Sequence, residues 1–464
     1  MSDMQRIKKR AAALAMTMTL AVSGIPSCAF AAATPAAAQT GAVTPSPTPT
    51  LASPADAATV ATNGIEGWPK ADDIYSTVGC LMDADTGAVL YDKGMNQQMF
   101  PASTTKVMTC LLALEYGKLD DTVTVTQTGV NYAVSGSSNL NTQVGEQFKL
   151  EDMLYAMMLK SANDIATTIG EHIGGGSIDK FVAMMNDKAR ELGCTNTHFA
   201  NACGMPDDQH YTTAHDMALI GRAALQYPLF CTIIHTPSYT IPATNMTAQR
   251  TVTTHNALLI DPNYMVDGII GGKTGYTDAA RSCLISFVER EGRTLICMTM
   301  HAQDGGYACL DHKALYTYGF GSFTNEAIPV GGGTSTMTVT LPQTAAAADC
   351  TVDVKDAEAE DGEEQVALTA MYEGQAVGET VMAKAAYEKT GEAASTEEEP
   401  ASGMSEASES TGTNVSENRK SGVTMDFRRL AETKSGLAIL IFGILVLAGI
   451  AAIVITLIVR RRRR

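Results

Sequence analysis

The order of the sequence patterns along the chain limits the folds that it can adopt. Residues 76–91 form two alternating apolar runs around an Asp- and Gly-rich turn, which predicts a β-hairpin. Helical patterns follow through residues 150–225, and residues 266–300 return to short β-like runs. Strands from both ends of this region must pair to bury their apolar faces, with the helices between them. We therefore predict an α+β fold, in which an antiparallel sheet is flanked by helices and carries a helical insertion.

The individual elements can be placed from the spacing of apolar residues. Residues 150, 153, 154, 157 and 158 are apolar, and this spacing is typical of one face of a helix. Four helices are predicted in the insertion, over residues 150–159, 164–173, 181–192 and 213–225. Beyond residue 325 the chain alternates Thr and Val, which predicts strands over 336–341, 350–354 and 366–371. The expected organisation is a large domain over residues 71–324 and a small β domain over 325–390.

Both ends of the sequence carry targeting features. Residues 1–33 have a basic start, an apolar stretch and small-x-small cleavage candidates, so they predict a secretory signal peptide. Residues 34–70 are expected to be a disordered spacer, and residues 391–434 a flexible acidic stalk. Residues 435–459 include an uncharged run long enough to cross a bilayer, and the arginines at 460–464 favour a cytoplasmic tail. The body of the protein is therefore expected on the extracellular side, anchored by a C-terminal transmembrane helix.

Charge and cysteine content narrow the classes of partner. The formal net charge is −17, and both ends are basic, so the exported part is more acidic still. This excess of negative charge argues against nucleic acid and against anionic lipid headgroups as partners. Nine of the ten cysteines follow the signal, and an odd number excludes a complete set of disulfides within one chain. The cysteines and histidines show no metal-like spacing, so we expect no metal and no cofactor.

Ser103 and Lys106 are the first candidates for chemistry. They are three residues apart, Pro101 suits the start of a helix, and Gly117 suits its end. Both side chains would lie on one helix face, close enough to hydrogen-bond. A serine hydroxyl needs a base to become a nucleophile, and a lysine acts as one only if its pKa falls far below about 10.4. The spacing alone is a weak signal.

Two further motifs strengthen the signal from the spacing of Ser103 and Lys106. Ser103-Thr104-Thr105-Lys106 is followed by Ser161-Ala162-Asn163 and by Lys273-Thr274-Gly275. In this order the set resembles the active site of penicillin-recognising serine acyl-transferases, the class A β-lactamases and penicillin-binding proteins. The longer matches are residues 101–106, 161–166, 196–204, 210–214 and 271–277. They resemble the D-alanyl-D-alanine carboxypeptidases, low-molecular-mass penicillin-binding proteins, over about residues 72–320. The resemblance implies a β-lactamase/transpeptidase-like fold.

The resemblance also implies roles for individual residues. Ser103 would be the acyl-ester nucleophile, Lys106 its general base, and Ser161 a proton relay between Lys106 and Lys273. Asn163 would bind the substrate amide and hold Lys106. Lys273 would lower the pKa of Lys106 and, with Thr274, receive the substrate carboxylate. Gly275 would leave room for the substrate backbone, and the backbone N–H groups of Ser103 and Tyr276 would form an oxyanion hole.

The resemblance implies removal of the terminal D-alanine from peptidoglycan stem peptides, with penicillins as covalent inhibitors. Two alternatives stay open, a β-lactamase and a non-catalytic penicillin- or wall-binding module. A class A β-lactamase uses a glutamate in a Glu-x-x-x-Asn context, and neither Glu171 nor Glu191 has Asn four residues later. The histidines at 198, 210 and 215 are expected to be structural. One departure from the family pattern is Arg281-Ser282, where many relatives have a Gly-aromatic pair.

Overall fold

The computed structural model describes residues 58–331, 335–357 and 364–388. The predicted signal peptide, stalk, transmembrane helix and tail lie outside the described residues, as does most of the predicted spacer. Within the described ranges, no single helix is long and apolar enough to cross a membrane. Two consecutive helices, bent by 110° relative to each other, meet the length and composition criteria only as a pair.

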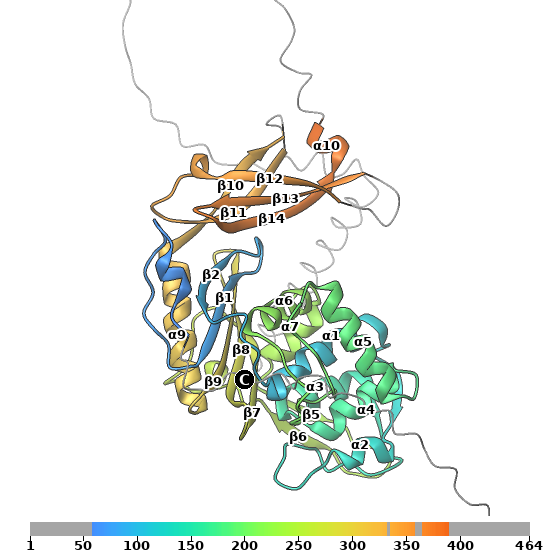
Figure 1. Ribbon diagram of the computed structural model, residues 1–464. Helices are drawn as coiled ribbons and strands as arrows, with labels where there is room; N and C mark the ends of the chain where they lie inside the picture. Colours follow the sequence, from blue (N-terminus) through green and yellow to red (C-terminus); the bar gives the residue numbers. More distant parts are fainter. Residues whose placement is uncertain (1–57, 332–334, 358–363, 389–464) are drawn as a thin grey trace, which may run out of the picture. The chain divides into compact units, whose positions relative to one another are not determined.

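A five-stranded antiparallel sheet forms the centre of the fold, in the order β2-β1-β9-β8-β7 (Figure 1). Its strands are β1 (Val78–Asp83), β2 (Val89–Lys93), β7 (Ile269–Thr277), β8 (Arg281–Arg290) and β9 (Arg293–Ala302). The prediction of a sheet built from both ends of this region, with helices inserted between, is confirmed. The β-like region predicted from residue 266 begins slightly later, because β7 starts at Ile269 and continues through Lys273-Thr274-Gly275.

Helices cover one face of the sheet (Figure 1). They are α1 (Lys106–Tyr116), α2 (Gln127–Asn131), α3 (Leu150–Lys160), α4 (Asn163–Ile173), α5 (Ile178–Glu191), α6 (Ala214–Ala224), α7 (Pro228–His235) and α8 (Ala257–Ile260). Four of them, α3 to α6, coincide with the predicted helices to within a few residues. Two short two-stranded antiparallel sheets accompany them, β3 (Thr122–Thr124) with β4 (Gln147–Lys149), and β5 (Ser238–Ile241) with β6 (Arg250–Thr253).

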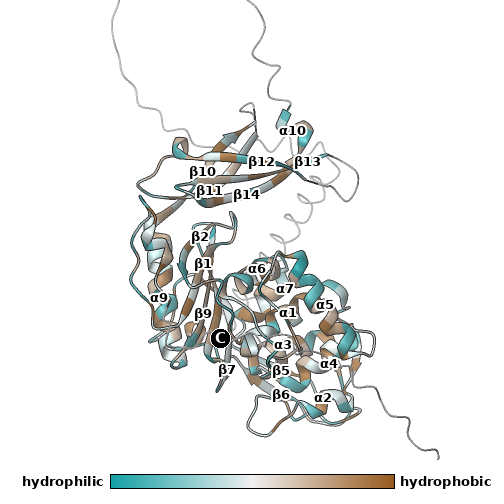
Figure 2. Cartoon of the chain, viewed as in Figure 1, coloured by the Kyte–Doolittle hydropathy of each residue, from teal (hydrophilic) through white to brown (hydrophobic). Residues whose placement is uncertain are grey.

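Strand β1 shows how the sheet separates two cores. All six of its residues are buried, and alternate side chains point to opposite faces. Cys80 and Met82 belong to the core beneath the helices, whereas Leu81 belongs to the core beneath α9 (Gly305–Ser322). In Figure 2 the hydrophobic colours lie on these strands and on the helices that cover them. The sheet is therefore a buried platform with a helical layer on each face.

The N-terminal segment packs against α9, and this corrects one prediction. The spacer was expected to reach residue 70, but residues 58–70 belong to the packed structure and include a 3-10 turn, Ala61–Gly64. Trp68 is 2% exposed, and its indole N–H donates to the carbonyl of Leu90. The Tyr318 hydroxyl on α9 donates to the carbonyl of Pro69. Burial of one large aromatic residue outweighs the polar composition around it.

The residues after α9 form two small sheets, a hairpin and a three-stranded antiparallel sheet in the order β12-β13-β14. The strands are β10 (Phe323–Val330), β11 (Ser335–Pro342), β12 (Thr351–Ala357), β13 (Gln365–Tyr372) and β14 (Gln375–Ala383), with a 3-10 turn at Ala347–Asp349 and α10 at Lys384–Glu388. The three predicted strands correspond to β11, β12 and β13. Thr86, in the turn between β1 and β2, hydrogen-bonds Thr340 at 2.6 Å between hydroxyl oxygens.

All nine cysteines between Cys80 and Cys350 are free, and seven of them are buried. Burial raises the pKa of the Cys110 thiol to about 12. The seven buried cysteines act as small core residues.

Candidate active site

Ser103 lies in a 3-10 turn, Ala102–Thr105, that runs directly into α1. The preceding residue, Ala102, has a φ of 48°, a left-handed conformation that a residue with a Cβ rarely adopts. The hydroxyl of Thr104 donates to the carbonyl of Pro101, and that of Thr105 to the carbonyl of Ala102. These bonds fix the strained turn, and they place Ser103 at the start of the helix with Lys106 one turn later.

Lys106 is fully buried and makes three polar contacts. Its Nζ lies 2.9 Å from Ser103 Oγ, 2.7 Å from Asn163 Oδ1 and 2.6 Å from the backbone oxygen of Cys203. The amide orientation of Asn163 is consistent with this, since its Nδ2 faces the sulfur of Met205 at 3.5 Å. Two of the three contacts are therefore carbonyl oxygens, which only accept hydrogen bonds. The third is a hydroxyl, which can donate or accept.

Ser161 and Lys273 form a second pair beside the first. Lys273 is 2% exposed, and its Nζ donates to Ser161 Oγ at 3.0 Å and to the backbone oxygen of Thr274 at 2.7 Å. Ser161 ends α3 in a left-handed conformation, with φ 61°. This turn separates α3 from α4, so Asn163 can begin the next helix and point at Lys106. The structure thus brings Ser103, Lys106, Ser161, Asn163 and Lys273 together from four elements.

Burial shifts the pKa of both lysines. Loss of hydration lowers the pKa of Lys106 to about 8, although Cys203 and Asp164 oppose the shift. Burial, followed by the charge on Lys106, holds the pKa of Lys273 well below its usual range. From the sequence, the charge of Lys273 was expected to help lower the pKa of Lys106. In the structure desolvation is the larger cause for both lysines, and the charge on Lys106 adds to the shift of Lys273.

A cleft of about 780 Å³ opens over these residues. Ser103, Ser161 and Asn163 line its floor, and the end of β7 from Thr274 to Thr277 lines one side. β7 is the last strand in the sheet order, so among the described residues one of its edges has no partner strand. An extended peptide can add to such an edge through main-chain hydrogen bonds. Tyr276 is 55% exposed in the cleft, and its backbone follows Gly275 past the turn that carries Ser103.

The structure shows a further reason why position 275 is a glycine. A Cβ at this position would lie 2.9 Å from the backbone nitrogen of Ser103 and 3.1 Å from the Pro101 carbonyl oxygen. The glycine therefore lets β7 approach the nucleophile turn itself, in addition to the expected approach of a substrate. This contact brings the N–H groups of Ser103 and Tyr276 to the same end of the cleft.

The segment from Asn201 to Met205 holds Lys106 from the other side, and sequence reasoning gave it no role. Asn201 Oδ1 accepts from the backbone N–H groups of Cys203, Gly204 and Met205, which orients the Cys203 carbonyl toward Lys106. Gly204 has a φ of 88°, and a Cβ there would lie 1.8 Å from the carbonyl oxygen of Ala102. The signal in the sequence was that Asn201 and Gly204 lie in residues 196–204, one of the stretches that resemble the family.

His210 supports the nucleophile turn from outside the cleft. Its Nδ1 accepts from the backbone N–H of Ala200 at 3.0 Å, so its Nε2 carries the proton toward Thr105 Oγ1 at 2.8 Å. Burial lowers the pKa of His210 to about 3, which keeps the ring neutral. This placement agrees with the structural role expected for the histidine.

The two glutamates considered for a β-lactamase mechanism lie elsewhere. Glu171, on α4, accepts a hydrogen bond from Thr126, and Glu191, on α5, pairs with Lys188. Neither is among the residues that line the cleft.

The backbone at Arg281-Ser282, where the sequence departs from the family pattern, has a conformation that suits glycine. Arg281 has a φ of 53°, in the left-handed region that glycine adopts readily, and its side chain is exposed. Ser282 is 7% exposed and lines the cleft beside β7.

Comparisons with known proteins agree with this geometry. The sequence model of the peptidase S11 family, described as D-alanyl-D-alanine carboxypeptidase, matches residues 66–304. The chain is similar to the D-alanyl-D-alanine carboxypeptidase DacB2 of Mycobacterium tuberculosis, at 34% identity over 52% of this chain and 80% of the relative. It is equally similar, at 34% identity, to DacF of Bacillus subtilis, where the match covers 48% of this chain and just over half, 56%, of the relative.

Among solved structures, the chain resembles the Streptomyces K15 DD-transpeptidase, with a TM-score of 0.51 and 29% identity. That likeness covers 55% of this chain and 100% of the K15 chain. The central sheet, the helical layer and the three motifs around the cleft lie within the matched region. The chain therefore belongs to the peptidase S11 family, the D-alanyl-D-alanine carboxypeptidases.

Proposed function

We propose that this protein is a serine-type D-Ala–D-Ala carboxypeptidase that removes the terminal D-alanine from peptidoglycan stem peptides. The observation that carries the proposal is the contact set of Lys106. A neutral lysine has two N–H donors and one lone pair. The two carbonyl oxygens, of Asn163 and Cys203, accept both donors, which leaves the lone pair for the hydroxyl proton of Ser103. The pKa of about 8 makes this neutral form accessible near physiological pH.

Acylation would follow from this arrangement. Ser103 Oγ attacks the carbonyl carbon of the D-Ala–D-Ala peptide bond while Lys106 takes the hydroxyl proton. The oxyanion of the tetrahedral intermediate is stabilised by the backbone N–H groups of Ser103 and Tyr276. As the intermediate collapses, the C–N bond breaks, and the proton taken up by Lys106 passes through Ser161 to the nitrogen of the leaving D-alanine, which leaves Lys106 neutral again. Water then hydrolyses the acyl ester and restores Ser103.

Lys273 and Thr274 would bind the substrate carboxylate at the end of β7. A carboxylate beside Lys273 favours its protonated form, and the resulting positive charge favours neutral Lys106. Substrate binding would therefore prepare the base as well as orient the peptide. The same groups would receive the carboxylate of a penicillin, which would acylate Ser103 and be released slowly, because neither Glu171 nor Glu191 lines the cleft.

The proposed location is the outer face of the cytoplasmic membrane, where peptidoglycan is available. It rests on the sequence of residues 1–33 and 435–464, a secretory signal and a C-terminal transmembrane anchor with an arginine tail. We assign no cofactor to the reaction, since the serine and lysine chemistry requires none.

Release of D-alanine from a pentapeptide that ends in D-Ala–D-Ala tests the proposal. The wild-type protein should release it, and Ser103→Ala should release none while keeping the wild-type melting temperature. Absence of release from folded wild-type protein would contradict the proposed activity.

A further inference from the structure

One side of the cleft is formed by a loop that the mechanism above does not use. Residues 134–138, here named the cleft wall, lie between α2 and β4 and line the same cleft as the end of β7. The segment is mostly polar, with Ser135, Ser137 and Ser138 around Gly136. A peptide added to the β7 edge would share the cleft with this wall. The wall is short and irregular, so its position depends on what holds it.

The first anchor of the wall comes from the catalytic motif itself. The backbone N–H of Asn163 donates to the carbonyl of Ser138 at 2.9 Å. The next residue, Asp164, is fully buried and accepts hydrogen bonds from the backbone N–H groups of Leu140 and Thr142 and from the Thr142 hydroxyl. The start of α4 therefore fixes the end of the wall nearest Ser103.

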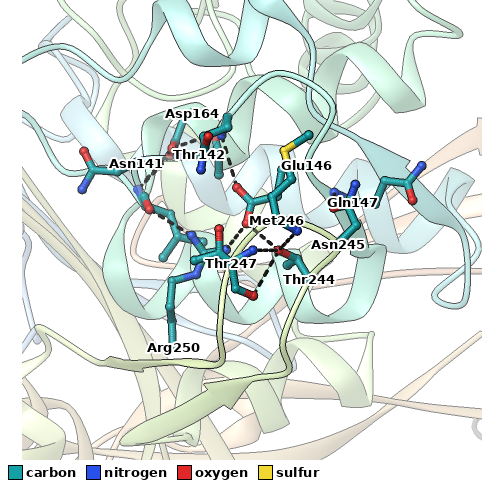
Figure 3. Close-up of polar contacts among 12 residues, drawn as sticks. Asn141, Thr142, Glu146, Gln147, Asp164, Thr244, Asn245, Met246, Thr247 and Arg250 are labelled. Carbon is teal, nitrogen blue, oxygen red and sulfur yellow. Dashed lines mark hydrogen bonds and ion pairs between the residues drawn. The ribbon is translucent and has the colours of Figure 1, made fainter.

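The second anchor is a buried ion pair that comes from the β5–β6 hairpin (Figure 3). Glu146, at the far end of the loop, is fully buried, and its Oε1 accepts from Arg250 Nη2 at 2.7 Å and from Thr244 Oγ1 at 2.8 Å. Its Oε2 accepts from the backbone N–H of Gln143 at 3.2 Å. Arg250 also donates through Nη1 to the carbonyl of Leu140 at 3.3 Å. Leu140 is thus held at its N–H by Asp164 and at its C=O by Arg250.

Burial alone would raise the pKa of Glu146. Hydrogen bonds from Thr244, Thr247 and Gln143 and the charge on Arg250 outweigh it and hold the pKa below the ordinary value. The carboxylate is therefore charged, and the pair is a charge-assisted contact between a fully buried carboxylate and a partly exposed guanidinium. Such contacts are geometrically demanding, and removing one partner leaves the other buried and uncompensated.

Arg250 is also close in sequence to a residue that lines the cleft. It lies on β6, and His255, five residues later, lines the cleft near β7. A third contact joins the hairpin to the loop, because Asn245 accepts from the backbone N–H of Gln147 and donates to the carbonyl of Gly145. The distance between the wall and the substrate edge is therefore set by the hairpin as well as by α4.

We propose that Arg250 and Glu146 are positioning residues that fix the cleft wall against the bound peptide and so determine the preference for longer stem peptides over short ones. The inference rests on the proposed function. The residues of a stem peptide that precede D-Ala–D-Ala would extend along β7 beside the wall, whereas an acetylated dipeptide ends close to Ser103. Displacement of the wall should therefore weaken the binding of long substrates and leave the binding of short ones unchanged.

Arg250→Gln tests the inference in the full-length protein, with a D-Ala–D-Ala pentapeptide and acetyl-D-Ala–D-Ala as substrates. Loss of one to two hydrogen bonds predicts an increase of about fivefold in KM for the pentapeptide, with kcat within about twofold of wild type. KM for the acetylated dipeptide should not change. Arg190→Gln is the matched control, because Arg190 pairs with Asp187 on the exposed surface of α5 and should alter neither substrate. A loss of stability alone would lower the active fraction for both substrates equally.

A second variant covers the case in which Arg250→Gln does not fold. Asn245 is exposed, so Asn245→Ala should fold, and it should shift the same ratio by about twofold. Equal changes for the two substrates, or no change in a folded variant, would overturn the inference while leaving the proposed function intact. If the wild type released D-alanine from neither peptide, the proposed function would fail, and the inference with it.

Discussion

The side-chain nitrogen of Lys106 lies 2.9 Å from the hydroxyl oxygen of Ser103, inside a site where the lysine is completely buried. Its two other hydrogen bonds end on carbonyl oxygens, so the contact with Ser103 is the one through which Lys106 can accept a proton. The rest of the site is built around this pair. The Asn201–Met205 segment supplies one carbonyl, the start of α4 supplies the other, and β7 brings Lys273 and the substrate edge.

The first prediction concerns the pH dependence of acylation. Burial lowers the pKa of Lys106 to about 8, and the neutral form is the base, so the acylation rate should rise as pH increases through about 8. The measurement is the rate of covalent binding of a penicillin between pH 5 and pH 11. A rising limb near about 10.4, the value of an exposed lysine, would contradict a buried, neutral base.

The second prediction separates the effect of Lys273 from that of burial. Lys273→Met removes a charge near Lys106 and keeps an apolar side chain of similar length. Because the repulsion between two cations acts on both, the rising limb of acylation should move to higher pH. Affinity for substrates with a free carboxylate should fall as well. If the pH profile kept its position, desolvation alone would account for the pKa of Lys106.

The third prediction tests the turn that carries Ser103. Gly204→Ala would place a Cβ 1.8 Å from the carbonyl oxygen of Ala102, so the turn must shift. A displacement of about 1 Å at a nucleophile typically costs about 10²-fold in rate. Gly193→Ala is the matched control, since Gly193 has a φ of 78° and a Cβ there would meet nothing within 4 Å. The control should lose about 1–2 kcal/mol of stability and keep its acylation rate.

The fourth prediction concerns stability in acid. His312 is fully buried between Ser286 and Thr299, and burial lowers its pKa to about 3. Between pH about 6.5 and about 3, the unfolded chain binds a proton at this residue that the folded protein does not. The free energy of unfolding should therefore decrease as the pH is lowered. Between pH 7 and pH 5, this residue should contribute a loss of about 2 kcal/mol.

Urea unfolding of wild type and His312→Gln at several pH values would measure this contribution. The variant should lose stability less steeply between pH 7 and pH 5, whatever its stability at neutral pH. Equal slopes for the two proteins would show that His312 does not carry the effect.

The sequence predicted the central architecture because its signals are local. The hairpin of β1 and β2, the helices α3 to α6 and the pair β8–β9 each have a regular apolar period and a recognisable turn or cap. α9 was not predicted. It begins at Gly305-Gly306, contains Gly319 and Gly321, and carries aromatic residues around its circumference, because it packs on the sheet and on the N-terminal segment. A helix buried on two sides has no clear apolar stripe.

The side chains of the candidate site were predicted from the sequence, whereas its main-chain contacts were not. Ser103, Lys106, Ser161, Asn163 and Lys273 have side chains whose chemistry is visible in the sequence, and their spacing matches a known family. The carbonyl of Cys203, the turn held by Asn201, and the approach of Gly275 to the Ser103 turn are main-chain contacts. Main-chain groups are the same at every position, so only the fold reveals which of them serve the site.

The most direct test of the account is the location of a covalent penicillin adduct. Wild-type protein is treated with benzylpenicillin, digested, and analysed by mass spectrometry, with Ser103→Ala and Ser161→Ala in parallel. The account predicts a single adduct on the peptide that contains Ser103, none in Ser103→Ala, and a slower formation of the same adduct in Ser161→Ala. An adduct on another residue, or a folded wild-type protein that forms none, would contradict it.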